Sequence, residues 1–161
     1  MQYSQSTGKV EFNPLTKTSF KPLTKEDLMA AIDVFMSLSA EAQQIANINS
    51  WDVSSITDMS NVFKGRKTFN HPLNKWDVSN VLNMETMFMN CIAFNQSLND
   101  WDVSNVINMS GMFVTCLVYN QPMDKWDTRN VMLMNEMFAE CISFNQPLNS
   151  WNTSNVRTMS Q

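Results

Sequence analysis

Residues 76–101 read W-D-V-S-N-V-L-N-M-E-T-M-F-M-N-C-I-A-F-N-Q-S-L-N-D-W, and close variants of this stretch recur along the chain. The tryptophans of the sequence all lie 25 residues apart, at Trp51, Trp76, Trp101, Trp126 and Trp151. A fixed period of roughly 20–50 residues is typical of arrays in which each unit buries its apolar face against its neighbours. The period therefore predicts a stack of repeated units.

We number each repeat from its tryptophan, which is position 1. Four full repeats result, 51–75, 76–100, 101–125 and 126–150, and a partial fifth repeat covers 151–161. Apolar side chains occupy positions 6, 9, 12, 13, 19 and 23, with Met always at position 9 and Phe always at position 13. These columns predict the core of the stack.

The spacing of the apolar columns suggests two elements per repeat. Positions 6, 9, 12, 13 and 16 are three or four residues apart, which predicts a short helix or 3₁₀ turn over positions 5 to 16. Position 19 to position 3 of the next repeat is expected to be a short parallel strand, which begins near a proline in most repeats. The predicted fold class is thus α/β, a leucine-rich-repeat-like solenoid of 25-residue units with an N-terminal helical cap.

The repeat resembles the DUF285 repeats of the BspA-like leucine-rich-repeat superfamily. The string W-D-V-S-N-V-x-x-M-x-x-M-F, as in 76–88, and the string F-N-Q-P-L-N-x-W, as in 144–151, carry the resemblance. It extends from about Phe20 to the C-terminus. It implies an uncharacterised surface or interaction protein, of a kind found in bacteria including mycoplasmas, in microbial eukaryotes and in large DNA viruses, and it brings no catalytic residues.

Two segments precede the repeats. Residues 1–19 are polar and are expected to be an arm that orders only on a partner. Residues 20–50 are expected to be the helical cap that an array needs at its end, with one helix starting after Thr24 and a second after Ser39. The apolar stripe of the first helix contains Leu28, Ile32, Phe35 and Leu38.

Composition limits the function classes. A net charge of −4 argues against a nucleic-acid partner, which needs a basic face. No apolar run approaches the length of a membrane span, and residues 1–23 lack the apolar core of a signal peptide. These features predict an intracellular location. The resemblance implies a virion location as well, because large DNA viruses carry this repeat, and the cell surface is the alternative.

Three columns of side chains invite a metal-binding interpretation. Cys91, Cys116 and Cys141 at position 16 are too far apart in sequence for a typical zinc site and are expected to be buried thiols. The Met pairs at positions 9 and 12 are candidate Cu(I) ligands, but their place on the apolar stripe favours core packing. The aspartates at position 2 are candidate calcium ligands, but their context favours turns in which each carboxylate accepts a nearby backbone N–H.

Other polar columns are expected to be structural. The asparagines at position 20 predict a ladder of side-chain amides that satisfy backbone groups. Alternating charge at position 25, which includes Asp100 and Lys125, predicts ion pairs between neighbouring repeats. The basic cluster 64–67 is expected to be a solvated loop that pairs with Glu26 or Asp27. His71 is expected at the surface or in a turn.

Binding surfaces are sought where the repeat ends or varies. The chain stops at position 11 of the fifth repeat, so Trp151, Val156 and Met159 are expected to lie at an open end that packs on a protein partner or on a second copy. If positions 14 and 18 face outward, Met89, Val114 and Val118 form a further apolar stripe for a partner.

The sequence contains no Ser-His-Asp set, Cys-His pair or phosphate-binding glycine loop, so we expect no enzyme activity, cofactor, metal or small-molecule substrate. The expected function is a non-catalytic repeat protein that mediates protein–protein interaction or serves as a structural component of an assembly. A cell-surface adhesin without its export signal is the alternative.

Overall fold

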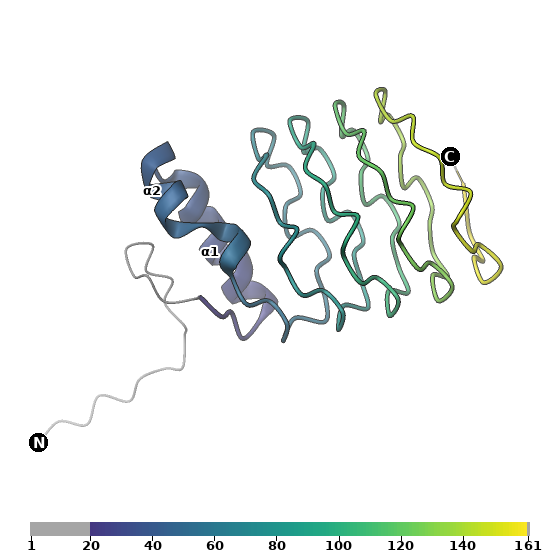
Figure 1. Ribbon diagram of the computed structural model, residues 1–161, viewed down its shortest axis with the longest axis horizontal. Helices are drawn as coiled ribbons and strands as arrows, with labels where there is room; N and C mark the ends of the chain where they lie inside the picture. Colours follow the sequence, from purple (N-terminus) through teal and green to yellow (C-terminus); the bar gives the residue numbers. More distant parts are fainter. Residues whose placement is uncertain (1–19, 161) are drawn as a thin grey trace, which may run out of the picture.

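The computed structural model describes residues 20–160, and the polar arm predicted for 1–19 lies outside them. Two helices and a 3₁₀ turn come first: α1 (Lys25–Ser37), α2 (Ala40–Ala46) and η1 (Ile48–Ser50). From Trp51 onward the chain winds through four turns and part of a fifth, and each turn is one repeat (Figure 1). Within 20–160 no helix follows η1, and there is no β-strand.

The two expected helices are present, and their caps explain where they begin. Thr24 accepts a hydrogen bond from Asp27 N, and the Asp27 carboxylate accepts one from Thr24 N, which forms a capping box at the start of α1. Ser39 caps α2 by accepting from Ala42 N. Leu28, Ile32 and Phe35 of α1 are fully buried, as the apolar stripe predicts.

The short helix or 3₁₀ turn predicted over positions 5 to 16 of each repeat is not present as a helix of either kind. The third repeat shows what replaces it: Met112 N donates to Met109 O, Val114 N to Gly111 O and Cys116 N to Phe113 O. These overlapping bonds between residues three apart are turn bonds, and they give apolar side chains the three-residue spacing that resembles a helix. The periodicity was therefore real, but it has a different physical origin.

Left-handed residues stop these turns from becoming a helix. Positions 11 and 15 have positive φ in every full repeat. The residues are Asn61, Gly65, Thr86, Asn90, Gly111, Thr115, Glu136 and Glu140. A right-handed helix needs negative φ throughout, so a left-handed residue every fourth position breaks it after each turn.

The predicted parallel strand over positions 19 to 3 is also absent. Neighbouring turns instead form one parallel β-bridge each at position 8, as between Asn83 and Asn108, inside the segment that was expected to be helical. Inside positions 19 to 3 the backbone bends through a tight turn bond, for example from Trp101 N to Leu98 O, which interrupts an extended strand. The prediction of an α/β leucine-rich-repeat solenoid was therefore wrong, because the stacked turns contain neither element.

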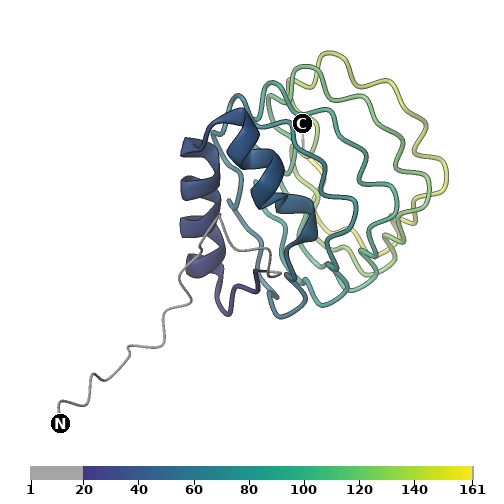
Figure 2. The same cartoon turned by 60° about the vertical axis from the view of Figure 1, so that its left-hand side comes forward.

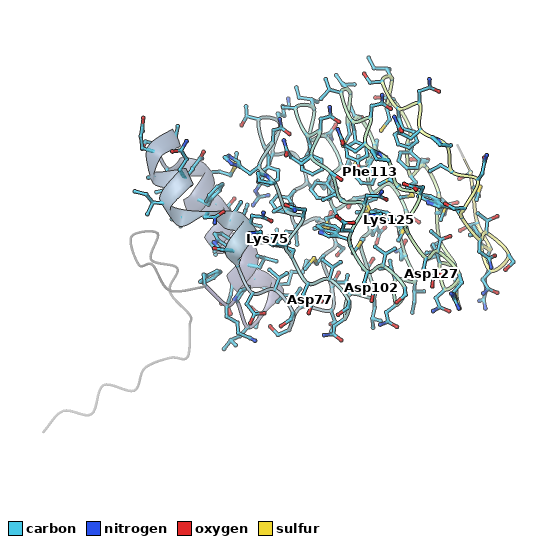
Figure 3. The ribbon with its side chains drawn as sticks, in the orientation of Figure 1. Lys75, Asp77, Asp102, Phe113, Lys125 and Asp127 are labelled. Atoms are coloured by element: carbon cyan, nitrogen blue, oxygen red, sulfur yellow. The ribbon has the colours of Figure 1, made fainter. Side chains whose placement is uncertain are left out.

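The core consists of columns that run along the stack. Phe63, Phe88, Phe113 and Phe138 at position 13 stack with ring centroids 5.2–5.7 Å apart. The position-19 rings stack beside them, and Figure 3 shows Phe113 inside the turns. Each column joins equivalent atoms of adjacent repeats, which is why one residue type recurs at each position.

The tryptophans form a column of their own. Trp51, Trp76, Trp101 and Trp126 are at most 3% exposed, as predicted, while Trp151 is only partly buried. In the central turns the indole N–H donates to the backbone carbonyl 28 residues earlier, as from Trp101 Nε1 to Leu73 O at 2.9 Å. The tryptophan therefore joins two repeats by a polar as well as an apolar contact.

The polar side chains at positions 2, 20 and 25 make the structural contacts that the sequence predicts for them. Asp77 and Asp102 each accept a hydrogen bond from the backbone N–H two residues later, and Figure 3 shows them in one row with Asp127. Asn95 Oδ1 accepts from Asn120 N of the next turn, and the other position-20 asparagines repeat this bond. Lys125 pairs with Asp100 across 2.7 Å, as predicted for position 25.

The helices cover the N-terminal side of the first turn (Figure 2). Phe35 contacts the rings of Trp51 and His71, with centroids 5.9 and 5.0 Å away, so His71 is partly buried under α1. Arg66 of the basic cluster pairs with Asp33 at 2.6 Å, which corrects the expected pairing with Glu26 or Asp27. Asp33 lies on α1 nearly two helical turns after Glu26 and Asp27, within reach of position 16 of the first repeat.

Candidate functional site

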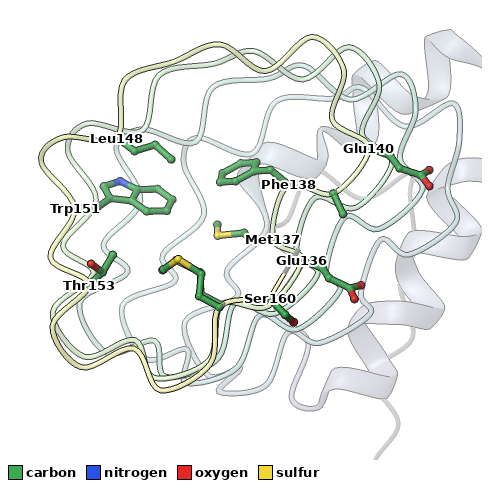
Figure 4. A pocket seen from close by; sticks show the side chains of 11 residues that line it. Glu136, Met137, Phe138, Glu140, Leu148, Trp151, Thr153 and Ser160 are labelled. Carbon is green, nitrogen blue, oxygen red and sulfur yellow. The ribbon is translucent and has the colours of Figure 1, made fainter.

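An apolar hollow opens at the C-terminal end of the stack (Figure 4). Its volume is about 640 Å³. Side chains and backbone of the fourth repeat and the partial fifth line it, namely Met134, Glu136, Met137, Phe138, Ala139, Glu140, Leu148, Trp151, Thr153, Met159 and Ser160. These are the same positions that pack against the following turn elsewhere in the stack.

The floor of the hollow is made of core columns that end there. Phe138 is the last ring of the position-13 column and is partly buried, whereas Phe113 before it is fully buried. Trp151 stacks on Trp126 at 6.0 Å, and its other face lies toward the hollow. Met159 is 59% exposed, although methionine at the same position is buried in the four full repeats. The hollow therefore exposes the packing surface of a turn.

The backbone at this end carries hydrogen-bond donors that have no partner in the described part of the chain. At each inner junction, the amides at positions 9, 11, 13 and 15 donate to carbonyls at positions 8, 10, 12 and 14 of the next turn. In the fourth repeat, Met134 N and Glu136 N donate to Thr158 O and Ser160 O. The amides of Phe138 and Glu140 make no hydrogen bond with any residue in 20–160.

Charged side chains stand on the rim of the hollow. In Figure 4 the carboxylates of Glu136 and Glu140 point outward, away from the apolar floor formed by Met137, Phe138 and Leu148. Thr115 Oγ1 of the preceding turn donates to Glu140 Oε2 at 3.0 Å. The site is thus an apolar floor with an edge of amide donors and an acidic rim.

The structure brings together two of the residues predicted for partner binding. Trp151 and Met159 both line the hollow. Val156 is partly buried against the core and does not line it. Met89 and Val114 are partly buried on inner turns and Val118 is 44% exposed, all outside the hollow. A binding role for these six residues stays a prediction.

Sequence reasoning missed most of the hollow. Met137, Phe138 and Leu148 belong to core columns, and only the end of the stack exposes them. It also missed a stripe at position 7, where Leu82 and Ile107 are 47% and 40% exposed beside the partly buried Met132. The amide donors gave no sequence signal at all, because every residue other than proline has one.

The cysteine column is buried, as predicted. The Cys91, Cys116 and Cys141 thiols are free, and each donates to the carbonyl of the phenylalanine 28 residues earlier. Burial raises the pKa of the Cys91 thiol to about 12 and that of the Cys141 thiol to about 11, so both are protonated at neutral pH. The column thus presents protonated thiols, each of which serves as a hydrogen-bond donor inside the stack.

Among residues 20–160, no three His, Cys, Asp or Glu side chains are grouped so as to hold a metal ion. No helix in that range is long and apolar enough to cross a membrane.

Comparison with known proteins places these repeats. A family model described as "Mycoplasma protein of unknown function, DUF285" matches residues 31–132 and 100–161. The chain belongs to the DUF285 family. Neither the curated proteins nor the solved structures contain a match to it. The DUF285 match begins inside α1 and includes every turn of the stack, so the family pattern covers the cap contact as well as the hollow.

Proposed function

We propose that this DUF285 protein is a non-catalytic protein-binding module whose binding surface is the hollow at the C-terminal end of the stack. The observation that carries the proposal is the combination of an apolar floor with two backbone donors, Phe138 N and Glu140 N, that have no partner among residues 20–160. Burial of the apolar floor supplies affinity, and the backbone N–H donors fix the orientation of a bound chain. Both features suit a polypeptide ligand.

The chemistry of the lining favours binding over catalysis. Methionine, phenylalanine, leucine and tryptophan side chains make its floor, and its polar side chains are Glu136, Glu140, Thr153 and Ser160. Neither a cysteine nor a histidine is among them. The buried, free thiols elsewhere in the stack suit a reducing compartment, and we propose an intracellular setting on that ground.

Selection from a library of displayed 15-residue peptides tests the proposal. We expect peptides that bind the parent chain and bind Met159→Asp at least tenfold more weakly, because a carboxylate in the floor of the hollow must be desolvated. Leu82→Asp is the matched control, since Leu82 is exposed on an inner turn. Failure to enrich any binder, or binders that treat all three chains alike, would contradict the proposal.

A further inference from the structure

An apolar patch lies on the side of the stack, on two turns that each have a neighbouring turn above and below. It consists of positions 14, 17 and 18 of the second and third repeats, namely Met89, Ile92, Ala93, Val114, Leu117 and Val118. Val118 is 44% exposed and the other five are partly buried. Because turns add along the stack axis, a further turn at either end would leave these side chains uncovered. We call this surface the lateral patch.

Tight turns of the backbone place the lateral patch outside the core. Cys91 N donates to Phe88 O, and Cys116 N donates to Phe113 O, so each repeat turns between positions 13 and 16. The phenylalanine and the cysteine of each turn are fully buried. Positions 14 and 17 therefore lie on the outer side of the turn, where equivalent side chains of successive repeats form two apolar columns.

The spacing between the turns matches the pitch of an α-helix. Ring centroids of successive repeats are 5.2–5.7 Å apart at position 13 and 5.8–6.2 Å apart at position 19, the two positions that flank the lateral patch. An α-helix rises about 5.4 Å per turn, whereas an extended strand returns to the same face after about 6.4–6.8 Å. A helix laid along the stack axis therefore sets one apolar side chain on each repeat, and a strand falls out of step.

The first repeat places a basic edge beside the lateral patch. Its positions 14 and 17 are Lys64 and Lys67, which are both exposed. Arg66 between them pairs with Asp33, but neither lysine forms an ion pair within residues 20–160. On the fourth repeat, the Glu140 carboxylate points outward at position 15 (Figure 4). A ligand on the patch is thus attracted by its acidic end to the first repeat and by its basic end to the fourth.

The helices of this chain do not supply such a ligand, either in the same molecule or in a second copy. The apolar stripe of α1, which includes Phe35, is already buried on the first turn. α2 has only seven residues, and Ile45 is its one large apolar side chain that is exposed. In residues 1–19, Pro14 lies between the apolar residues closest to α1, and proline disfavours a helix interior.

We propose that the lateral patch binds an amphipathic α-helix of a partner protein, laid along the stack axis. Apolar side chains three or four residues apart on that helix lie on the columns of positions 14 and 17, one for each repeat. Its first turn is acidic and lies over Lys64 and Lys67, and its last turn is basic and lies near Glu140. This direction also suits the helix dipole, which favours acids at the N-terminus and cations at the C-terminus.

Selection from a library of helical peptides tests this inference. Each peptide has about 15 residues, with leucine fixed at one position per helical turn and the remaining positions randomised. Selection on the chain 1–161 should enrich Asp or Glu in the first helical turn and Lys or Arg in the last. The most enriched peptide is then synthesised, and its affinity for the chain is measured by fluorescence anisotropy.

Two substitutions in the third repeat locate the bound peptide. Val118→Asp should weaken binding at least tenfold, because the new carboxylate would be desolvated under the helix. Ile107→Asp is the matched control, since Ile107 is 40% exposed on another face of the same repeat, and it should leave binding unchanged. Met159→Asp in the hollow should also leave binding unchanged, which separates this inference from the binding function proposed above. All three side chains are at least 40% exposed, so the variants should fold.

Charge reversal tests the direction of the helix. Lys64→Glu combined with Lys67→Glu should weaken binding of the selected peptide at least fivefold. The same double variant should bind a peptide with exchanged acidic and basic turns more tightly than the parent chain does. A spin label at the N-terminus of the selected peptide should broaden the NMR signals of residues 64–67 before those of 139–143, and the opposite order would overturn the inference.

Three further results would overturn it. Equal weakening by Val118→Asp and Ile107→Asp would show that the lateral patch is not the binding site. Binding that Met159→Asp alone abolishes would place the helix in the hollow. A chain that gathers on lipid vesicles through Val118 and selects no helical peptide would show that the patch contacts a membrane surface instead.

Discussion

The two ends of this stack present opposite sides of the same repeating unit. At the N-terminal end, α1 covers the first turn, and Phe35 and His71 are in contact beneath it. At the C-terminal end, the fourth turn exposes Phe138 and the amides of Phe138 and Glu140. A repeat alone has no means of closing itself, so each end needs a different structure to satisfy it.

The N-terminal end of the stack is covered by helices and not by a further repeat. The cap uses a helix whose own backbone is satisfied, and it reaches the stack through side chains such as Lys25 and Asp33. At the C-terminal end, the amides of Phe138 and Glu140 have no such cover among residues 20–160. Four experiments test this difference between the ends, in order of decreasing effect.

Replacing Trp101 by Ala tests the interior against the C-terminal end. Trp101 is 3% exposed and holds Leu73 O, so Trp101→Ala should destabilise the chain by about 3–5 kcal/mol. Trp151→Ala at the end should lose only about 2 kcal/mol, because its ring is already partly exposed. Urea unfolding followed by circular dichroism measures both. Equal losses would mean that the end is as well packed as the interior.

Weakening the contact between α1 and the stack should expose the first turn, as the fourth turn is exposed at the C-terminal end. Phe35→Ala removes a fully buried ring from under α1 and should cost about 3 kcal/mol. Release of α1 exposes the acceptor side of the first turn, so head-to-tail oligomers should appear with rising concentration in analytical ultracentrifugation. Adding Met159→Asp should suppress them. A Phe35→Ala chain that stays monomeric at every concentration would contradict the complementarity of the two sides.

The rates at which Cys91 and Cys141 are alkylated compare an inner turn with the last full turn. Cys141 lies in the last full turn, is 9% exposed and has a pKa of about 11, whereas Cys91 is fully buried with a pKa of about 12. At pH 8 the native chain should therefore react at Cys141 first, about tenfold faster than at Cys91. Mass spectrometry of peptides after timed exposure to iodoacetamide gives the order. Simultaneous loss of all three thiols would indicate global unfolding instead.

Acid should loosen the capped end slightly. The Lys21 ammonium, with Ser54, lowers the pKa of the Asp52 carboxyl from 3.8 to about 2. A lowered pKa stabilises the fold above about pH 4, and this contribution is lost as pH falls from 4 to 2. Because the Asp52 side chain is 40% exposed, the loss should be below about 1 kcal/mol.

Asp52→Asn tests that contribution, and Asp77→Asn in the second turn is its matched control. The difference in melting temperature between the parent chain and Asp52→Asn should shrink between pH 5 and pH 2. Should Asp77→Asn show the same change, the effect belongs to the Asx turn and not to the pairing with Lys21.

Much of the packing was readable from single residues. The capping box at Thr24, the buried columns at positions 9, 13 and 16, and the Asx turns at position 2 all follow from local chemistry that repeats every 25 residues. The secondary structure of the repeat was not readable, because overlapping turns and a helix both place apolar side chains three or four residues apart. Arg66 pairs with Asp33, and not with Glu26 or Asp27, because the orientation of α1 decides which carboxylate lies within reach of the guanidinium.

By itself, the sequence determined the period, the columns that are buried, the family and the two helices of the cap. Only the tertiary structure decided that positions 11 and 15 are left-handed, although Thr and Glu occupy them as well as Gly and Asn. Those conformations persist because contacts with both neighbouring turns stabilise them, and a linear pattern of residue types does not record such contacts.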